Sequence, residues 1–167
     1  MANAVYCRNG HSNGFVPERT QRYQYVGVMH DWEERQNREG LARLAFCPRC
    51  GEHNINCCLH CKTTIEDVDG TSERPLFCCA CGKPFPWTEV TLASAREYTD
   101  DLDGLSAEDK TDLKATFDDL AKDTPRTDLA VSRFMKFIRK IGPGAGGVLK
   151  EIITNVATEA AKRKMGI

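Results

Sequence analysis

The chain has 167 residues, of which 28% are charged and 41% hydrophobic, and its formal net charge is −1. This composition is ordinary for a globular protein and excludes a largely disordered chain. The sequence has no run of about 18 apolar residues that could span a bilayer, and its N-terminus lacks the pattern of an export signal. We therefore expect a cytoplasmic protein without a membrane partner.

The cysteines divide the chain into two parts. All nine lie between Cys7 and Cys81, and the second half of the sequence has none. Because the cytosol keeps thiols reduced, cysteines at this density indicate metal binding rather than disulfides. The sequence therefore predicts an α+β protein with two domains, a metal-binding domain over residues 1–87 and an all-α helical bundle over residues 88–167.

The cysteine-rich domain begins with one potential ligand pair and continues with three more. Each pair places two side chains on one short turn, and glycines at positions 10, 51 and 82 allow the backbone conformations that such turns need. Four pairs supply enough ligands for two closed tetrahedral zinc sites. The pairs are Cys7 with His11 in CRNGH, Cys47 with Cys50 in CPRCG, Cys58 with Cys61 in CLHC, and Cys78 with Cys81 in CACG.

The sequence permits two ways of combining these pairs. The short gap between Cys50 and Cys58 would let the two middle pairs share one metal and leave the outer pairs to share the other. A sequential arrangement instead places strand-forming segments, residues 21–28, 63–70 and 74–78, within the two sites. We expect this sequential arrangement, in two small zinc-ribbon units. The first zinc is then bound by Cys7, His11, Cys47 and Cys50, and the second by Cys58, Cys61, Cys78 and Cys81.

Two cysteines and three histidines remain outside this assignment. Cys57 and Cys79 have poorer ligand spacing than their neighbours, so we interpret them as small, partly buried side chains rather than as ligands or redox centres. His30, His53 and His60 could substitute as ligands, but we expect them at the surface or at caps.

Residues 15–44, between the first and second ligand pairs, mix arginines with the aromatic side chains Tyr23, Tyr25 and Trp32. Such a composition suits single-stranded nucleic acid, through phosphate contacts and base stacking. Acidic residues offset the arginines, however, and Asp31 with Glu34 has the spacing of a helix capping box. We therefore expect a short solvated helix within this linker.

The pattern becomes helical after the last cysteine pair, and we expect about four helices. Thr88 is expected to cap the first helix, and Ser106 with Asp109 forms a capping-box signal for the second. Glycines at 142–147 are expected to break the third, and residues 148–164 predict a fourth helix with one apolar face and a basic end. This domain is the expected surface for a protein partner or for a second copy of the chain.

Charge also changes along the chain. Residues 1–87 are neutral overall, residues 88–124 carry seven more acidic than basic side chains, and residues 125–167 carry six more basic than acidic ones. Opposite charges attract if the segments fold together, whereas a nucleic-acid-binding protein usually keeps an uncompensated basic face. The pattern therefore favours internal pairing of charges.

The ordered motifs CRNGH, FCPRCG, CLHC, CCACGKPFPWTE and DTPRTDLAVSRF resemble those of a family of short bacterial zinc-ribbon proteins catalogued as a domain of unknown function. The resemblance covers residues 1–14 and 45–167, and CGKPFPWTE is its most specific part. It implies the same four ligand pairs, with no requirement for cysteine at positions 57 and 79. It implies no particular activity.

Function depends on whether a metal keeps an open coordination position, as catalytic zinc usually does. Each metal here can be bound by four protein ligands, and neither the metalloprotease nor the deaminase signature is present. We therefore expect a non-enzymatic scaffold with two structural zinc ions, which presents a surface to a protein partner or to itself. The alternatives are a nucleic-acid-binding zinc ribbon and an enzyme that uses a spare cysteine or an open zinc site.

Overall fold

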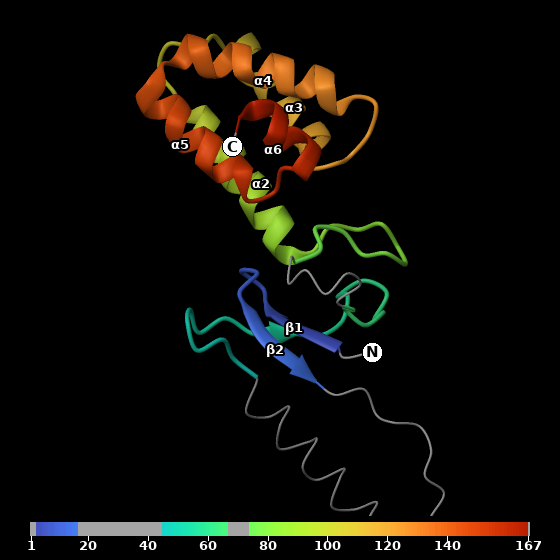
Figure 1. Ribbon diagram of the computed structural model, residues 1–167. Helices are drawn as coiled ribbons and strands as arrows, with labels where there is room; N and C mark the ends of the chain where they lie inside the picture. Colours follow the sequence, from blue (N-terminus) through green and yellow to red (C-terminus); the bar gives the residue numbers. More distant parts are fainter. Residues whose placement is uncertain (1–2, 17–44, 67–73, 167) are drawn as a thin grey trace, which may run out of the picture. The chain divides into compact units, whose positions relative to one another are not determined.

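The computed structural model describes residues 3–16, 45–66 and 74–166 of the chain (Figure 1). The predicted α+β class is confirmed, since a small sheet is followed by helices along the chain. The chain divides into two compact units, Met1–Trp87 and Thr88–Ile167. The elements are β1 (Asn3–Cys7), β2 (Ser12–Val16), β3 (Asn54–Ile55), α2 (Pro86–Asp100), α3 (Ala107–Leu120), α4 (Thr127–Ile141), α5 (Pro143–Thr154) and α6 (Glu159–Met165).

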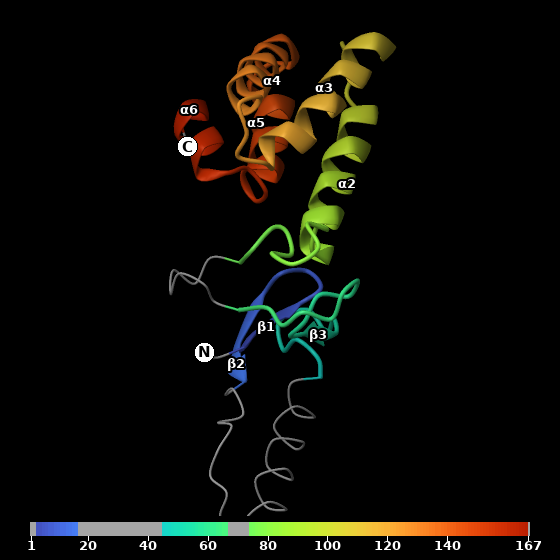
Figure 2. The ribbon, with the colours of Figure 1, turned by 90° about the vertical axis from the view of Figure 1, so that its right-hand side faces the viewer.

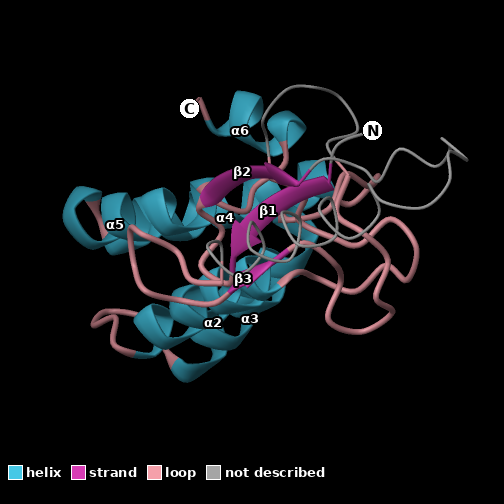
Figure 3. Cartoon of the chain, turned by 90° about the horizontal axis from the view of Figure 1, so that it is seen from below, coloured by secondary structure: helices cyan, strands magenta, loops and turns pink. Residues whose placement is uncertain are grey.

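The first unit is built on a three-stranded antiparallel sheet with the order β2-β1-β3 (Figure 3). Strands β1 and β2 form a hairpin in which Tyr6 lies opposite Ser12, so the hairpin turn carries the first ligand pair. The short strand β3 adds to the other edge of β1, where Tyr6 faces Ile55. The sheet therefore holds the Cys7–His11 turn from both sides.

The expected strands differ from those found. Residues 21–28 lie outside the described part of the chain, as does the predicted linker helix. Residues 63–66 and 74–78, described parts of the other two expected strands, form only isolated bridges, Cys57 with Thr64 and Phe77 with Pro84. The backbone oxygens of Thr63 and Leu76 accept hydrogen bonds across the Cys-x-x-Cys turns. Ile65 instead bonds to Asn56 and to Ala4 of β1, so the two segments form no continuous ladder with each other.

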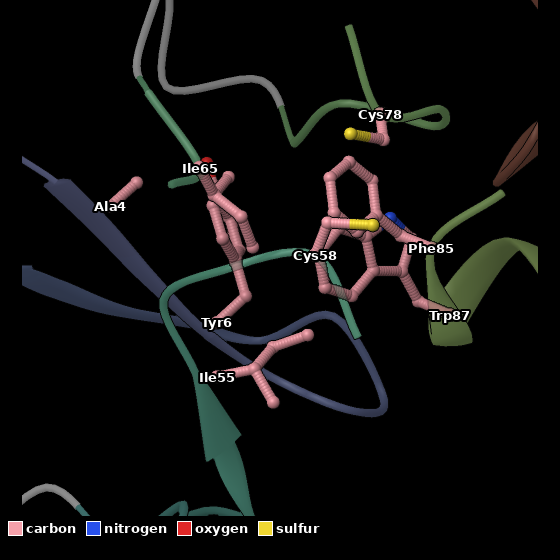
Figure 4. Close-up of a cluster of buried hydrophobic side chains, with 8 residues drawn as sticks. All are labelled: Ala4, Tyr6, Ile55, Cys58, Ile65, Cys78, Phe85 and Trp87. Atoms are coloured by element: carbon pink, nitrogen blue, oxygen red, sulfur yellow. The ribbon is translucent and has the colours of Figure 1, made fainter. Parts of the chain in front are cut away.

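The core of the first unit combines aromatic side chains with two ligand cysteines (Figure 4). The rings of Phe85 and Trp87 stack, with centroids 4.8 Å apart, and Tyr6 lies 5.2 Å from Trp87. So small a unit buries little apolar surface, which makes a metal a useful additional cross-link. The cluster consists of Ala4, Tyr6, Ile55, Cys58, Ile65, Cys78, Phe85 and Trp87.

In the second unit, α4 packs against α3, α5 and α6 (Figure 2). Helix α2 joins them through Tyr98, whose hydroxyl donates to the backbone oxygen of Ala145 in α5 at 3.4 Å, and through an ion pair between Arg96 and Asp118 in α3. The core is aliphatic and aromatic, as a helix bundle requires. Its fully buried side chains include Leu113, Phe117, Leu120, Phe134, Leu149, Ile153 and Val156.

The helix boundaries depart from the expected ones, although the capping box of Ser106 and Asp109 is present. Helix α2 begins at Pro86, ahead of the expected cap Thr88, because proline is tolerated in a first helical turn. Only Gly142 breaks the chain between α4 and α5, since the remaining glycines of 142–147 lie within α5. The described part of this unit has five helices, whereas about four were expected.

The expected final helix over residues 148–164 is two helices, α5 and α6. Thr158 separates them because its side chain accepts a hydrogen bond from the amide of Ala161 and so caps α6. Among the described residues, no helix has both the length and the apolar character needed to cross a bilayer.

Opposite charges pair across the two segments of unlike sign, as the sequence predicts. Lys140 forms an ion pair with Asp109, and Arg126 lies 3.1 Å from Asp119. Other ion pairs in the described part of this unit join residues within one segment, such as Lys164 with Asp128. Since all of these pairs are largely exposed, each contributes little to stability.

Candidate metal centres

Three turns of the first unit repeat one backbone geometry. In each, the amide of the first cysteine donates to the oxygen five residues later, and its own oxygen accepts from the amide four residues later. For Cys47 the partners are Glu52 and Gly51, both at 2.8 Å. The other two turns use Thr63 and Lys62 around Cys58, at 2.8 and 3.0 Å, and Lys83 and Gly82 around Cys78, at 2.8 and 2.9 Å.

The fourth residue after the first cysteine lies in the left-handed region of backbone space in all three turns. Gly51 and Gly82 have φ values of 71° and 69°, which glycine adopts without steric cost. Lys62 has φ of 63° and is the only non-glycine residue with positive φ in the described part of the chain. This shared bend directs both cysteine side chains of each turn to the same side.

The hairpin turn between β1 and β2 supplies the first ligand pair with a related geometry. Gly10, with φ of 82°, donates from its amide to the oxygen of Cys7 at 2.8 Å. The amide of His11 points at the Cys7 sulfur, 3.3 Å away. Backbone amides directed at a thiolate favour its charged form.

The structure brings together Cys7, His11, Cys47 and Cys50 as one cluster. Their ligand atoms all lie within 4.8 Å of one another. The Cys7 sulfur is 3.5 Å from Nδ1 of His11 and 3.7 Å from the sulfur of Cys50, and the Cys47 sulfur is 3.6 Å from the same nitrogen. Hence the β1–β2 turn and the first Cys-x-x-Cys turn face each other, although about forty residues separate Cys7 from Cys50.

Cys58, Cys61, Cys78 and Cys81 form the second cluster, also within 4.8 Å. The two turns are interleaved, since the sulfurs of Cys58 and Cys81 are 3.7 Å apart and those of Cys61 and Cys78 are 3.6 Å apart. These are the two sets of four that the sequential arrangement predicts. The middle pairs belong to different clusters.

The spacing of the ligand atoms fits a tetrahedral metal better than disulfides. Zinc–sulfur bonds of about 2.3 Å place two sulfurs of a tetrahedron roughly 3.8 Å apart, close to the sulfur–sulfur separations found here. A disulfide needs sulfurs at about 2.05 Å, and all nine cysteines are free. Both clusters could therefore hold a metal ion.

Each cluster has both buried and exposed ligand cysteines. In the first, Cys7 and Cys47 are buried while Cys50 is exposed. In the second, Cys58 and Cys78 are buried, and Cys61 and Cys81 are exposed. Each Cys-x-x-Cys turn thus presents one cysteine to the core and one to solvent.

Local hydrogen bonds favour thiolates at some of these positions. The side-chain hydroxyl and backbone amide of Thr63 lower the pKa of the Cys61 thiol to about 6. Burial raises the pKa of Cys7, although hydrogen bonds from the His11 and Asn9 amides oppose that rise. A divalent cation would favour the deprotonated ligands of both clusters.

The unassigned cysteines and histidines belong to neither cluster in the described part of the chain. Cys57 occupies the position of Phe46 and Phe77 in the other two turns, where the residue before the first cysteine forms an antiparallel bridge. Cys57 is partly buried as expected, whereas Cys79, also expected to be partly buried, is exposed because it lies in the solvent-facing part of the Cys78–Cys81 turn. His60 is exposed, and His30 lies outside the described residues. The ring of His53 packs on Phe46, with centroids 4.4 Å apart.

Three polar residues around the first cluster were not singled out from the sequence. The side-chain amide of Asn9 donates to the Cys50 sulfur at 3.6 Å, and Asn13 lies 3.7 Å from the Cys47 sulfur. The side-chain amide of Asn13 donates a 2.7 Å hydrogen bond to the side-chain oxygen of Asn54, the β3 residue that pairs with Cys7 of β1. The third, Arg74, lies far along the chain and donates a hydrogen bond to the backbone oxygen of Asn9 in the Cys7–His11 turn. Asn9 lies within the CRNGH motif and Asn13 follows it. Neither position has a spacing that predicts a contact with a cysteine sulfur, so these contacts had no sequence signature.

Comparison with known proteins places this arrangement in a family. Searches of curated proteins and of solved structures found no match. A family model described as an uncharacterized protein conserved in bacteria (DUF2321) matches residues 3–165, which is nearly the whole chain. The predicted resemblance to a bacterial domain of unknown function is therefore confirmed, and the chain belongs to this family.

Proposed function

We propose that the protein is a non-enzymatic interaction module whose first unit is held together by two structural zinc ions. The observation that carries this proposal is the pair of clusters, each with four ligand atoms within 4.8 Å. Sulfur and imidazole ligands in tetrahedral sets select zinc over magnesium or calcium, which prefer oxygen. Unpaired cysteines in this number also suit a reducing compartment such as the cytoplasm.

A structural role is supported by the number of protein ligands in each cluster. Each contains four protein ligands, so a bound tetrahedral ion would have no position left for water or substrate. Buried ligands of the second cluster, Cys58 and Cys78, are also members of the apolar core. Zinc would supply cross-links between the turns, in place of the apolar surface that so small a unit lacks.

Native mass spectrometry of the purified chain tests the zinc proposal. We expect two zinc ions per chain, and one fewer in Cys58→Ser. The matched controls are Cys57→Ser and Cys79→Ser, which change cysteines outside both clusters and should keep both ions. A wild-type chain with fewer than two ions, or a Cys79→Ser chain that loses one, would contradict the assignment.

The partner is proposed to be another protein or a second copy of the chain, bound through the helical unit. Three large apolar side chains of that unit are about half exposed, Val90 in α2 at 52%, Leu129 in α4 at 50% and Val148 in α5 at 45%. An exposed apolar side chain gains free energy when a partner removes it from water. Light scattering of the wild type and of Leu129→Asp and Val148→Asp would reveal self-association and its loss.

Nucleic-acid binding is the second candidate, and one observation favours it. Arg133, Lys136 and Arg139 lie at helical spacing on α4, and all three are exposed. None of them forms an ion pair with a described residue, whereas Lys140 of the same helix pairs with Asp109. Such unpaired cations can contact phosphates.

Fluorescence anisotropy with a labelled single-stranded oligonucleotide tests this candidate. Binding should weaken as salt rises, and the triple alanine variant of the unpaired cations should reduce the salt slope by about 2, at roughly 0.7 per phosphate contact. The control is Lys114→Ala, because Lys114 is already paired with Asp100. Absence of binding at about 50 mM salt would eliminate the candidate.

A further inference from the structure

Arg74 joins a distant part of the chain to the first cluster. Its Nη1 donates a hydrogen bond to the backbone oxygen of Asn9 at 3.3 Å, across 65 positions of sequence. Asn9 lies between Cys7 and His11, within the turn that supplies both of these ligands. The guanidinium therefore contacts the backbone that spaces the first ligand pair.

Gly10, the next residue of the turn, shows how closely Arg74 approaches. A Cβ atom on Gly10 would lie 2.0 Å from Nη1 and 2.9 Å from Cζ of Arg74, and 2.9 Å from Cβ of Trp87. A side chain at this position would be strained by φ of 82° and would press on Cβ of Trp87, and the Arg74 guanidinium would have to move away from the turn. Arg74 and the base of the Trp87 side chain thus both lie against this turn.

Arg74 is partly buried at this contact, and burial lowers the pKa of its guanidinium. An arginine side chain nevertheless stays charged in proteins under all ordinary conditions. Its hydrogen bond to the Asn9 oxygen is therefore a charge-assisted one.

We propose that Arg74 is a positioning residue of the first metal site, which holds the Cys7–His11 turn in its ligating shape. This inference rests on the proposed zinc function. Residues around the ligands commonly change metal affinity by 10–100-fold when they are substituted. Loss of Arg74 should therefore weaken the first site and leave the second unchanged.

The test uses the full chain loaded with zinc and titrated with a competing chromogenic chelator. Arg74→Met should lower the affinity of the first site by about 10–100-fold, and Arg74→Lys should restore part of it because an ammonium group can still donate to the Asn9 oxygen. The matched control is Arg49→Met, which removes an exposed arginine from the Cys47–Cys50 turn of the same site. Arg49 has no side-chain hydrogen bond or ion pair with the described residues, so its variant should bind like the wild type.

Cadmium NMR assigns the change to one site, because a site with three sulfurs and one nitrogen and a site with four sulfurs give separate signals. Arg74→Met should shift or broaden only the signal of the mixed site, and the signal of Arg74→Lys should stay closer to that of the wild type. Equal behaviour of Arg74→Met and Arg49→Met in a wild type that binds two ions would overturn the role of Arg74 alone. A wild type that binds no metal at the first cluster would instead overturn the proposed function.

Discussion

The indole nitrogen of Trp87 donates a 2.8 Å hydrogen bond to the backbone oxygen of Pro75, and the Trp87 side chain is only 1% exposed. The bond fastens the start of α2 to the segment that leads into the last Cys-x-x-Cys turn. The same ring stacks on Phe85 and contacts Tyr6. Trp87 thus joins the aromatic core of the first unit to the backbone around the second cluster.

Trp87→Phe should destabilise the first unit by about 0.5–1.5 kcal/mol, because the aromatic body remains but the part-buried carbonyl of Pro75 loses this donor. Trp87→Ala should cost more, about 3–5 kcal/mol, since it also leaves a cavity. Chemical unfolding in excess zinc, followed by hydrogen exchange of residues 3–16 and 45–66, measures both effects. Equal stability of Trp87→Phe and the wild type would show that the hydrogen bond contributes nothing.

Lys62 offers a substitution that should stabilise the protein. It has φ of 63° at the position where the equivalent turns have Gly51 and Gly82. A side chain in this conformation costs about 1–2 kcal/mol, so Lys62→Gly should raise stability by about 1 kcal/mol after the loss of its exposed hydrogen bond to Leu59. Gly82→Ala should lower stability for the same reason, and unfolding midpoints of the two variants should move in opposite directions.

Metal removal should affect the two units differently. Both clusters lie in the first unit, whereas the helical unit has an aliphatic and aromatic core of its own. A chelator should therefore abolish amide protection in residues 45–66 while the core helices α3 and α4 keep theirs. Hydrogen exchange with mass spectrometry, before and after chelation and after zinc is restored, gives the result. Unchanged protection of residues 45–66 without metal would contradict a structural role of zinc.

The helical unit should lose stability in acid through Asp109. A hydrogen bond from Lys140, followed by bonds from the amide and hydroxyl of Ser106, lowers the pKa of the Asp109 carboxyl below its ordinary value. A group whose pKa is lower in the folded state stabilises the fold above its unfolded pKa, and this contribution disappears as pH falls through the folded value. Asp109→Asn should therefore flatten the acid side of a stability–pH curve measured by thermal unfolding. The matched control is Asp112→Asn, which changes an exposed carboxylate of the same helix that has no ion pair with a described residue.

The ligand clusters were accessible to sequence reasoning because their signals are local. A Cys-x-x-Cys turn specifies its own geometry, and three such turns with the Cys7–His11 pair leave few ways of forming two sets of four ligands. The capping box of Ser106 and Asp109 is local in the same sense. What the spacing could not indicate is the partner from far along the chain, such as Arg74, which contacts Asn9 across 65 positions.

The strands were missed for a related reason. Strands β1 and β2 flank the CRNGH motif and have only five residues each. Such short runs show no clear alternation of apolar and polar residues. Strand β3 has only two residues, Asn54 and Ile55, and no alternation can be recognised over that length. Segments 63–70 and 74–78 have β-forming residues, but their described backbone groups bond across the Cys-x-x-Cys turns and, at Ile65, to Ala4 of β1, so the two segments do not pair with each other as strands.

The break that the run GPGAGG predicts is present at Gly142, but the run does not indicate that its other glycines are helical. The three glycines within α5 differ in their surroundings. A Cβ atom on Gly146 would lie 3.0 Å from the backbone oxygen of Ile138 and 3.2 Å from its Cγ2, so this glycine lets α5 pack closely on α4. At Gly144 and Gly147 a Cβ atom would meet nothing within 4 Å.

Alanine at these positions should therefore have opposite effects. Gly147→Ala should stabilise the helical unit by about 0.5–1 kcal/mol, because alanine loses less backbone entropy in a helix and here meets no obstacle. Gly146→Ala gains the same helix propensity but must push α5 away from Ile138, so it should be less stable than the wild type. Thermal unfolding followed by far-ultraviolet circular dichroism compares the two variants directly. If Gly146→Ala were stabilised as much as Gly147→Ala, α4 and α5 would not be in the close contact that Ile138 and Gly146 define.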